Sequence, residues 1–122
     1  MIKYKELQDA SVNKIPSELF ENAADFLVVL NKFREYCGIP MIPTSFYRTV
    51  EHEQKQGRSG KSDHTKCLAC DFRDTDKKLA KWVKDNTGVV ESLGLYVEDP
   101  EYTPSWLHLT TVKKSKIIFI PY

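Results

Sequence analysis

The segment from Pro16 to Cys37 carries the apolar pattern that most constrains how this chain can fold. Its apolar residues recur at intervals of three and four, the period of a helix with one buried face, and they are Leu19, Ala23, Phe26, Leu27, Leu30, Phe33 and Cys37. Ser17 or the residues before it can cap the start of such a helix, and Gly38 followed by Pro40 can end it. The pattern therefore predicts one main helix over this segment.

Short segments after this helix have the composition of β-strands. They are rich in β-branched, aromatic and other apolar residues, and they span residues 41–49, 68–72, 94–99, 106–111 and 116–121. Residues 51–61 indicate a turn of helix that runs into an exposed loop, and residues 74–86 indicate a second helix with Leu79, Trp82 and Val83 on one side. Helices first and short strands later predict an α+β fold, a small antiparallel sheet flanked by helices. At 122 residues, we expect a single domain over 1–122.

The charge and hydropathy of the chain argue against some classes of partner. A formal net charge of +1 gives no electrostatic reason to expect binding to nucleic acid or to an anionic membrane. Residues 1–11 lack the apolar core of a secretory signal, and no apolar run approaches the roughly 18 residues that a membrane span needs. We therefore expect a soluble chain, synthesised in the cytoplasm without a signal peptide, with no membrane span and no nucleic-acid partner.

The cysteines Cys37, Cys67 and Cys70 do not form a disulfide framework, because their number is odd and small. On an extended segment, the Cα atoms of Cys67 and Cys70 would lie about 10 Å apart, which is too far for a disulfide bond. Their CxxC spacing could be half of a structural zinc site or a redox motif, but no second pair follows and the segment has the pattern of a strand. We therefore expect both to be buried packing residues.

The histidines suggest a different metal site. Alternation along residues 106–111 places His108 on one face with Trp106 and Thr110, and alternation along residues 68–72 places Asp71 beside the small Ala69. Two strands and the loop that carries His64 could therefore present two imidazoles and a carboxylate, which leaves a fourth position on zinc open for water. The alternative is that the histidines are ordinary loop and strand residues and that Asp71 caps a turn.

Three separate pieces of the sequence resemble one family in the order in which that family has them. The stretch SDHTKCLACDF resembles the SxHxxGxAxD motif of the zinc-dependent D-alanyl-D-alanine carboxypeptidases, a family that includes VanY-type enzymes and phage endolysin peptidases. The later SWLHL resembles the family's WxH, and PMIPTSFYRTVEH is similar to the segment that leads to its YR pair. The resemblance runs from about Phe26 to Pro121 and implies the hedgehog/DD-peptidase fold.

The resemblance also implies roles for individual residues. His64, Asp71 and His108 would be the ligands of Zn²⁺, and Arg48 would stabilise the oxyanion or a substrate carboxylate. Ser62 and Tyr47 would add hydrogen bonds to the substrate, and Trp106 would form a wall of the cleft; His52 has no place in this set. The implied activity is hydrolysis of a peptidoglycan stem peptide, at a D-alanine bond or at the L-alanine to D-glutamate bond.

Two departures from the family pattern bear on these roles. The family's glycine is replaced by Cys67, so the loop would need a conformation that a side chain permits, or the thiol would lie close to the metal. Where many members have the catalytic carboxylate, three residues before the last histidine, this chain has Ser105, which cannot act as a general base at neutral pH. If residues 94–99 pair with residues 106–111 as a hairpin, Glu98 could supply the base, with Glu101 in reserve; alternatively, Glu98 is a solvated loop residue.

A cell-wall enzyme without an export signal is expected to be a phage or prophage product. It would act on the wall after release through a holin-dependent route, or as part of a virion. Two rival functions remain open from the sequence: a catalytically decayed module that binds metal or peptide, and a cytoplasmic zinc or redox protein built around Cys67 and Cys70.

Overall fold

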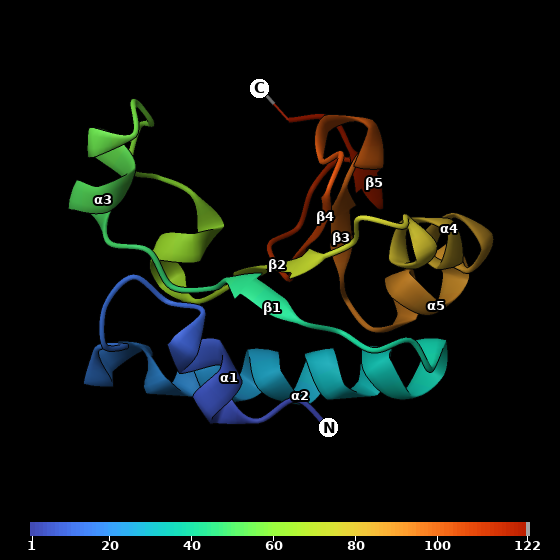
Figure 1. The fold of residues 1–122 in the computed structure, drawn as a ribbon, viewed down its shortest axis with the longest axis horizontal. Helices are drawn as coiled ribbons and strands as arrows, with labels where there is room; N and C mark the ends of the chain where they lie inside the picture. The colour runs from blue at the N-terminus through green and yellow to red at the C-terminus, as the bar shows by residue number, and fades with distance from the viewer. Residues whose placement is uncertain (122) are drawn as a thin grey trace.

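A computed structural model describes residues 1–121 of the chain (Figure 1). The α-helices are α1 (Tyr4–Asp9), α2 (Phe20–Cys37), α3 (Val50–Lys55), α4 (Lys78–Asp85) and α5 (Thr87–Ser92). The strands are β1 (Pro43–Ser45), β2 (Ala69–Arg73), β3 (Tyr96–Glu98), β4 (Trp106–Thr110) and β5 (Ile118–Phe119). Short 3₁₀ turns are η1 (Ser17–Leu19), η2 (Asp63–Lys66) and η3 (Pro100–Tyr102). The α+β class predicted from the sequence is confirmed.

The five strands form one sheet in the order β1-β2-β4-β3-β5. All neighbouring pairs are antiparallel except β3 and β5, which are parallel. The sheet is therefore antiparallel, as expected, except at one edge, where the pair is parallel. Strand β5 lies beyond β3 and pairs with it in parallel, with Val97 opposite Ile118 and Glu98 opposite Phe119.

Helix α2 is the main helix predicted from the apolar period, and the 3₁₀ turn η1 directly precedes it. The residues on its buried face are Ala23, Phe26, Leu30 and Phe33. The ring of Phe26 stacks on that of Phe46, just after β1, at 5.9 Å between centroids, and Phe33 meets Trp82 of α4 edge-on at 5.3 Å. The helix ends where Gly38 takes a left-handed conformation, with φ of 64°. Helix α2 therefore anchors both β1 and α4.

Two helices, α1 and α5, were not expected from the sequence. Each has six residues and buries a single side chain, Leu7 in α1 and Val90 in α5, so neither shows the repeated apolar spacing that reveals a helix. Helix α5 also contains Gly88 and β-branched valines, which have low helix propensity. Packing against the rest of the protein, rather than local preference, therefore accounts for these helices.

Strands β2 and β4 are the centre of the sheet and divide their side chains between its two faces. Cys70, Phe72, Leu107 and Leu109 are fully buried in the core. The alternate residues point to the opposite face, where Asp71 of β2 is paired in register with His108 of β4. Among residues 1–121, we find no helix that combines the length and the apolar character needed to cross a membrane.

Candidate metal centre

Three potential metal ligands converge on the open face of the central strands. They are His64 from η2, Asp71 from β2 and His108 from β4, and one ligand atom from each lies within 4.8 Å of the others. Asp71 Oδ1 is 2.7 Å from His108 Nδ1 and 3.5 Å from His64 Nε2. The structure thus brings together the three residues that the sequence suggested as a set.

His64 is held in one orientation and one protonation state. Its Nδ1 lies 2.6 Å from the carbonyl oxygen of Phe46, and because a carbonyl can only accept, Nδ1 carries the proton and donates it. Burial lowers the pKa of the His64 imidazole, although Asp71 partly opposes this, so the ring is neutral near neutral pH. Its Nε2 therefore has a lone pair directed at the group, and this buried nitrogen has no hydrogen-bond partner among the described residues.

The Asp71 carboxyl is ionised and divides its two oxygens between different partners. Burial alone would raise its pKa, but the hydrogen bond from His108 and the closeness of the His64 imidazole outweigh this and hold the pKa well below its usual range. Oδ1 faces the two imidazoles, whereas Oδ2 lies 3.3 Å from Arg48 Nη2. An ionised carboxylate beside a buried, unpartnered imidazole nitrogen is a donor set that fits a divalent metal ion such as zinc.

Arg48 lies between two carboxylates, and the second was not anticipated from the sequence. Its Nη1 is 3.7 Å from Glu53, whose side chain on α3 is completely buried. Glu53 also accepts hydrogen bonds from the Ser62 hydroxyl and, at 3.3 Å, from the Ser62 backbone N–H. A buried glutamate inside the charged stretch 51–61 is an exception to the rule that such residues face solvent. Composition therefore did not indicate its burial. The one available sequence signal was its position five residues after Arg48.

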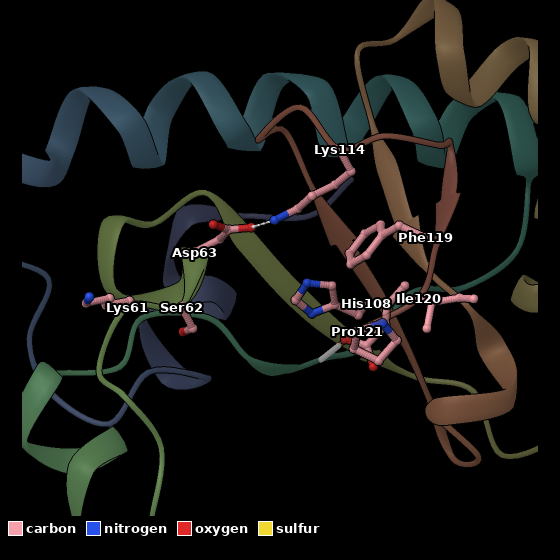
Figure 2. A pocket seen from close by; sticks show the side chains of 9 residues that line it. Lys61, Ser62, Asp63, His108, Lys114, Phe119, Ile120 and Pro121 are labelled. Carbon is pink, nitrogen blue, oxygen red and sulfur yellow. Dashed lines mark ion pairs between the residues drawn. The ribbon is translucent and has the colours of Figure 1, made fainter.

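Two adjoining cavities open onto this group. The first, about 380 Å³, is lined by Arg48, Glu53, Arg58, Ser62, His64, Asp71, Glu98, Trp106 and His108. Figure 2 shows the second, about 240 Å³, which is lined by Lys61, Ser62, Asp63, Glu98, His108, Lys114, Phe119, Ile120 and Pro121. Ser62, Glu98 and His108 belong to both, so a molecule lying across the two cavities would pass the candidate metal ligands.

Glu98 lies at the end of β3, half-buried on the wall of both cavities. The predicted hairpin is confirmed, since β3 pairs antiparallel with β4 and Val97 is opposite Leu109. Burial raises the pKa of the Glu98 carboxyl, and the nearby His108 partly opposes this. Glu101 is instead an exposed residue outside both cavities, and Ser105, also exposed, lines a separate cavity of about 290 Å³ beside Asp71 and Trp106.

The remaining predicted residues divide between the cavity and the core. Trp106 lines the first cavity, whereas Tyr47 is buried in the hydrophobic core and lines neither cavity. His52, on α3, also lines neither. The structure therefore brings Trp106 to the candidate site and leaves Tyr47 and His52 out of it.

The cysteines are packing residues, as expected, and all three are free thiols. Cys67 and Cys70 are fully buried, and burial raises the pKa of Cys67 to about 12. Of the two alternatives expected at Cys67, a loop conformation that a side chain permits or a thiol close to the metal, the structure has the first. Cys67 keeps the left-handed conformation that suits glycine, with φ of 58°, and its side chain enters the core. Neither cysteine belongs to the group of potential metal ligands found in residues 1–121, which removes the basis for a cysteine-built zinc site.

The comparisons with known proteins give one positive result. A family model described as Peptidase M15 matches residues 2–99, a span that contains Arg48, His64, Asp71 and Glu98 and ends before β4. The searches of curated proteins and of solved structures returned no match. Since the family model covers well over half of the 122 residues, and agrees with the resemblance of the motifs, the chain belongs to the Peptidase M15 family of metallopeptidases.

Proposed function

We propose that this protein is a zinc-dependent peptidase that hydrolyses a stem peptide of bacterial peptidoglycan. The observation that carries the proposal is the buried Nε2 of His64, which has no hydrogen-bond partner among the described residues and lies 3.5 Å from the ionised Asp71 carboxylate. A buried polar atom without a partner lowers the stability of the folded protein, so such an atom is rare unless it serves a function. Membership in a metallopeptidase family supports the same conclusion.

His64, Asp71 and His108 would hold the zinc ion. When bound, zinc would supply a Lewis acid that polarises a peptide carbonyl and makes a water molecule more acidic. The hydrogen bond from His64 to the Phe46 carbonyl and the strand pairing of Asp71 with His108 fix the ligand side chains before any metal arrives. Because these contacts already order the ligand side chains, little free energy is lost in ordering them when the metal binds.

Glu98 and Arg48 would carry out the proton transfer and the charge stabilisation. Glu98 would accept the proton of the attacking water and return it to the leaving amine, a role that a half-buried carboxylate with a raised pKa suits. Arg48 lines the same cavity and would donate hydrogen bonds to the carbonyl oxygen as its negative charge develops.

The two cavities suggest how a stem peptide would lie. Ser62 and Trp106 would contact the peptide in the first cavity. The second has the Lys61 cation and the ion pair of Lys114 with Asp63, at 3.0 Å, beside the apolar Phe119, which suits a substrate that carries both a carboxylate and small apolar side chains such as alanine. These features fit a D-alanine bond or the L-alanine to D-glutamate bond.

A second candidate is a module with the same fold that binds metal or peptide without turnover. The observation in its favour is Ser105, which stands where many family members have the catalytic carboxylate and which is exposed outside both cavities. The two candidates differ only in turnover, because both keep the same ligands.

Hydrolysis of purified peptidoglycan and of a stem pentapeptide by zinc-loaded protein tests the proposal. We expect release of D-alanine or of a cleaved stem by the wild type, and loss of this product in the His108→Ala and Glu98→Gln variants. Zinc binding without any product from the wild type would favour the non-catalytic module. Release of product by the His108→Ala variant at the wild-type rate would overturn the assignment of the metal site.

A further inference from the structure

Glu53 is a buried carboxylate at the edge of the proposed metal site, and it contacts two separate parts of that site. Its side chain has no exposed surface. It accepts hydrogen bonds from both the hydroxyl and the backbone N–H of Ser62, and it lies 3.7 Å from Arg48 Nη1. A buried carboxylate with three partners is a costly feature that the fold alone does not need, since an apolar residue would fill the same space.

The position of Arg48 depends on Glu53. The Nε of Arg48 is buried and has no hydrogen-bond partner among the described residues, so the guanidinium is held through its two terminal nitrogens. One faces Glu53 at 3.7 Å and the other faces Asp71 at 3.3 Å. Glu53 thus shares the charge of Arg48 with a proposed metal ligand.

The position of Ser62 depends on Glu53 as well. Ser62 immediately precedes η2, the 3₁₀ turn that carries His64, and its backbone carbonyl accepts hydrogen bonds from Thr65. Glu53 therefore connects α3 to the start of the turn that presents the His64 imidazole. Through Arg48, Glu53 is also connected to the Asp71 carboxylate.

We propose that Glu53 is a positioning residue that holds Arg48 and Ser62 in place and keeps Asp71 available to the metal ion. This inference rests on the proposed function. Without the negative charge of Glu53, Arg48 would have Asp71 as its remaining carboxylate partner among those it contacts in the structure. The guanidinium would then compete with the metal for Asp71, and its charge would oppose a divalent cation.

Titration of metal-free protein with zinc, in competition with a chelating dye, tests this without measuring turnover. The variant is Glu53→Gln, and the matched control is Glu51→Gln, which removes the same charge from an exposed position of the same helix. We expect zinc affinity to fall about tenfold in Glu53→Gln, the effect typical of losing a partner of a metal ligand, and to remain unchanged in Glu51→Gln. Far-UV circular dichroism identifies the folded fraction.

A double variant separates positioning from a general effect on the fold. If Glu53 keeps Asp71 available through Arg48, adding Glu53→Gln to Arg48→Met should lower zinc affinity less than Glu53→Gln does in the wild type, because only the contact with Ser62 is then lost. Equal losses with and without Arg48 would overturn the inference, as would wild-type affinity in folded Glu53→Gln. If Glu53→Gln does not fold, Glu53→Asp decides: its shorter side chain cannot reach both Arg48 and Ser62, so weakened zinc binding is expected and unchanged binding contradicts the role.

The same titration distinguishes this inference from the proposed function. A wild type that binds no zinc overturns both. A wild type that binds zinc as tightly as Glu53→Gln overturns the role of Glu53 alone. A wild type that binds zinc more tightly than Glu53→Gln, yet releases no product from peptidoglycan, supports the role of Glu53 and overturns the proposed catalysis.

Discussion

Asp71 and His108 are direct partners across the β2 and β4 pair, and Asp71 Oδ1 lies 2.7 Å from His108 Nδ1. Their neighbours on each strand, such as Cys70 and Leu109, are buried on the opposite face. A slip of one residue in this register would place an ionised carboxylate in the core and an apolar side chain at the site. Core packing therefore sets the geometry of two of the three candidate ligands.

The ligand assignment predicts which variants lose zinc. His64→Ala and His108→Ala should each abolish tight binding of a single zinc ion, because either change removes an imidazole from a set of three protein ligands. The Cys67→Ser and Cys70→Ser variants should retain the ion, since their thiols line neither cavity. Metal content after dialysis measures this, and zinc retained by His108→Ala but lost by the cysteine variants would reverse the assignment.

The assignment of Glu98 as the general base predicts a loss confined to turnover. Glu98→Gln keeps the size of the side chain and removes its proton acceptor, so kcat should fall about 10²- to 10⁴-fold while zinc content stays at the wild-type level. Glu101→Gln, an exposed residue of η3, is the control and should retain activity. A stem-peptide assay measures both, and similar kcat values for the two variants would exclude Glu98 as the base.

The parts of the site that follow from strand alternation were predictable from the sequence. Alternation with a period of two places His108 on the opposite face of the strand from Leu107 and Leu109, and these leucines are fully buried in the structure. The pairing of β3 with β4, which brings Glu98 to the cavities, followed from two strand patterns separated by a short loop.

Other features depend on contacts between distant segments, which a single sequence does not display. Glu53 is buried because Arg48 and Ser62 contact it from two sides, although Glu51, Gln54 and Lys55 around it in sequence are exposed. The resemblance to the family's YR pair implied a site role for Tyr47 beside Arg48, yet the Tyr47 side chain packs in the core. The parallel addition of β5 likewise depends on which sheet edge is left open, not on its own sequence.

The left-handed conformation of Cys67 predicts an unusual order of stability. Cys67→Gly should be more stable than Cys67→Ala by about 1 kcal/mol, because both lose the buried thiol but only alanine keeps a Cβ at φ of 58°. At Lys66, which does not have a positive φ, the order should reverse. Urea unfolding measures both pairs, and an alanine variant at position 67 as stable as the glycine variant would contradict the conformation.

Burial of the Cys67 thiol predicts a loss of stability at high pH. Its pKa is raised from 9.0 to about 12, so between these values the folded protein binds a proton that the unfolded chain has released. Stability should therefore fall as the pH rises above about 9, and between about pH 8 and about pH 10 this thiol should account for up to about 1.4 kcal/mol. Urea unfolding of the wild type and Cys67→Ala isolates the effect; an equal pH dependence in both would rule it out.

The capping of α4 by Asp74 predicts a large loss of stability from a residue outside both cavities. Asp74 is buried, and its carboxylate accepts the backbone N–H groups of Leu79 at 2.9 Å and Ala80 at 3.0 Å, which have no partner within the first turn of the helix. Asp74→Ala should destabilise the protein by about 2 kcal/mol, because two buried donors lose a charged acceptor.

The control is Asp76→Ala, which removes an exposed carboxylate that accepts the backbone N–H of Lys78 and lies 3.9 Å from its ammonium, and which should cost about 0.5 kcal/mol. The backbone of Asp74 also joins β2 to the residue before β4, through its N–H and the carbonyl of Ser105 at 2.9 Å. That contact does not involve the Asp74 side chain, so folded Asp74→Ala should bind zinc as the wild type does. Weaker zinc binding by the folded variant would mean that the cap of α4 also controls the pairing that sets Asp71 opposite His108.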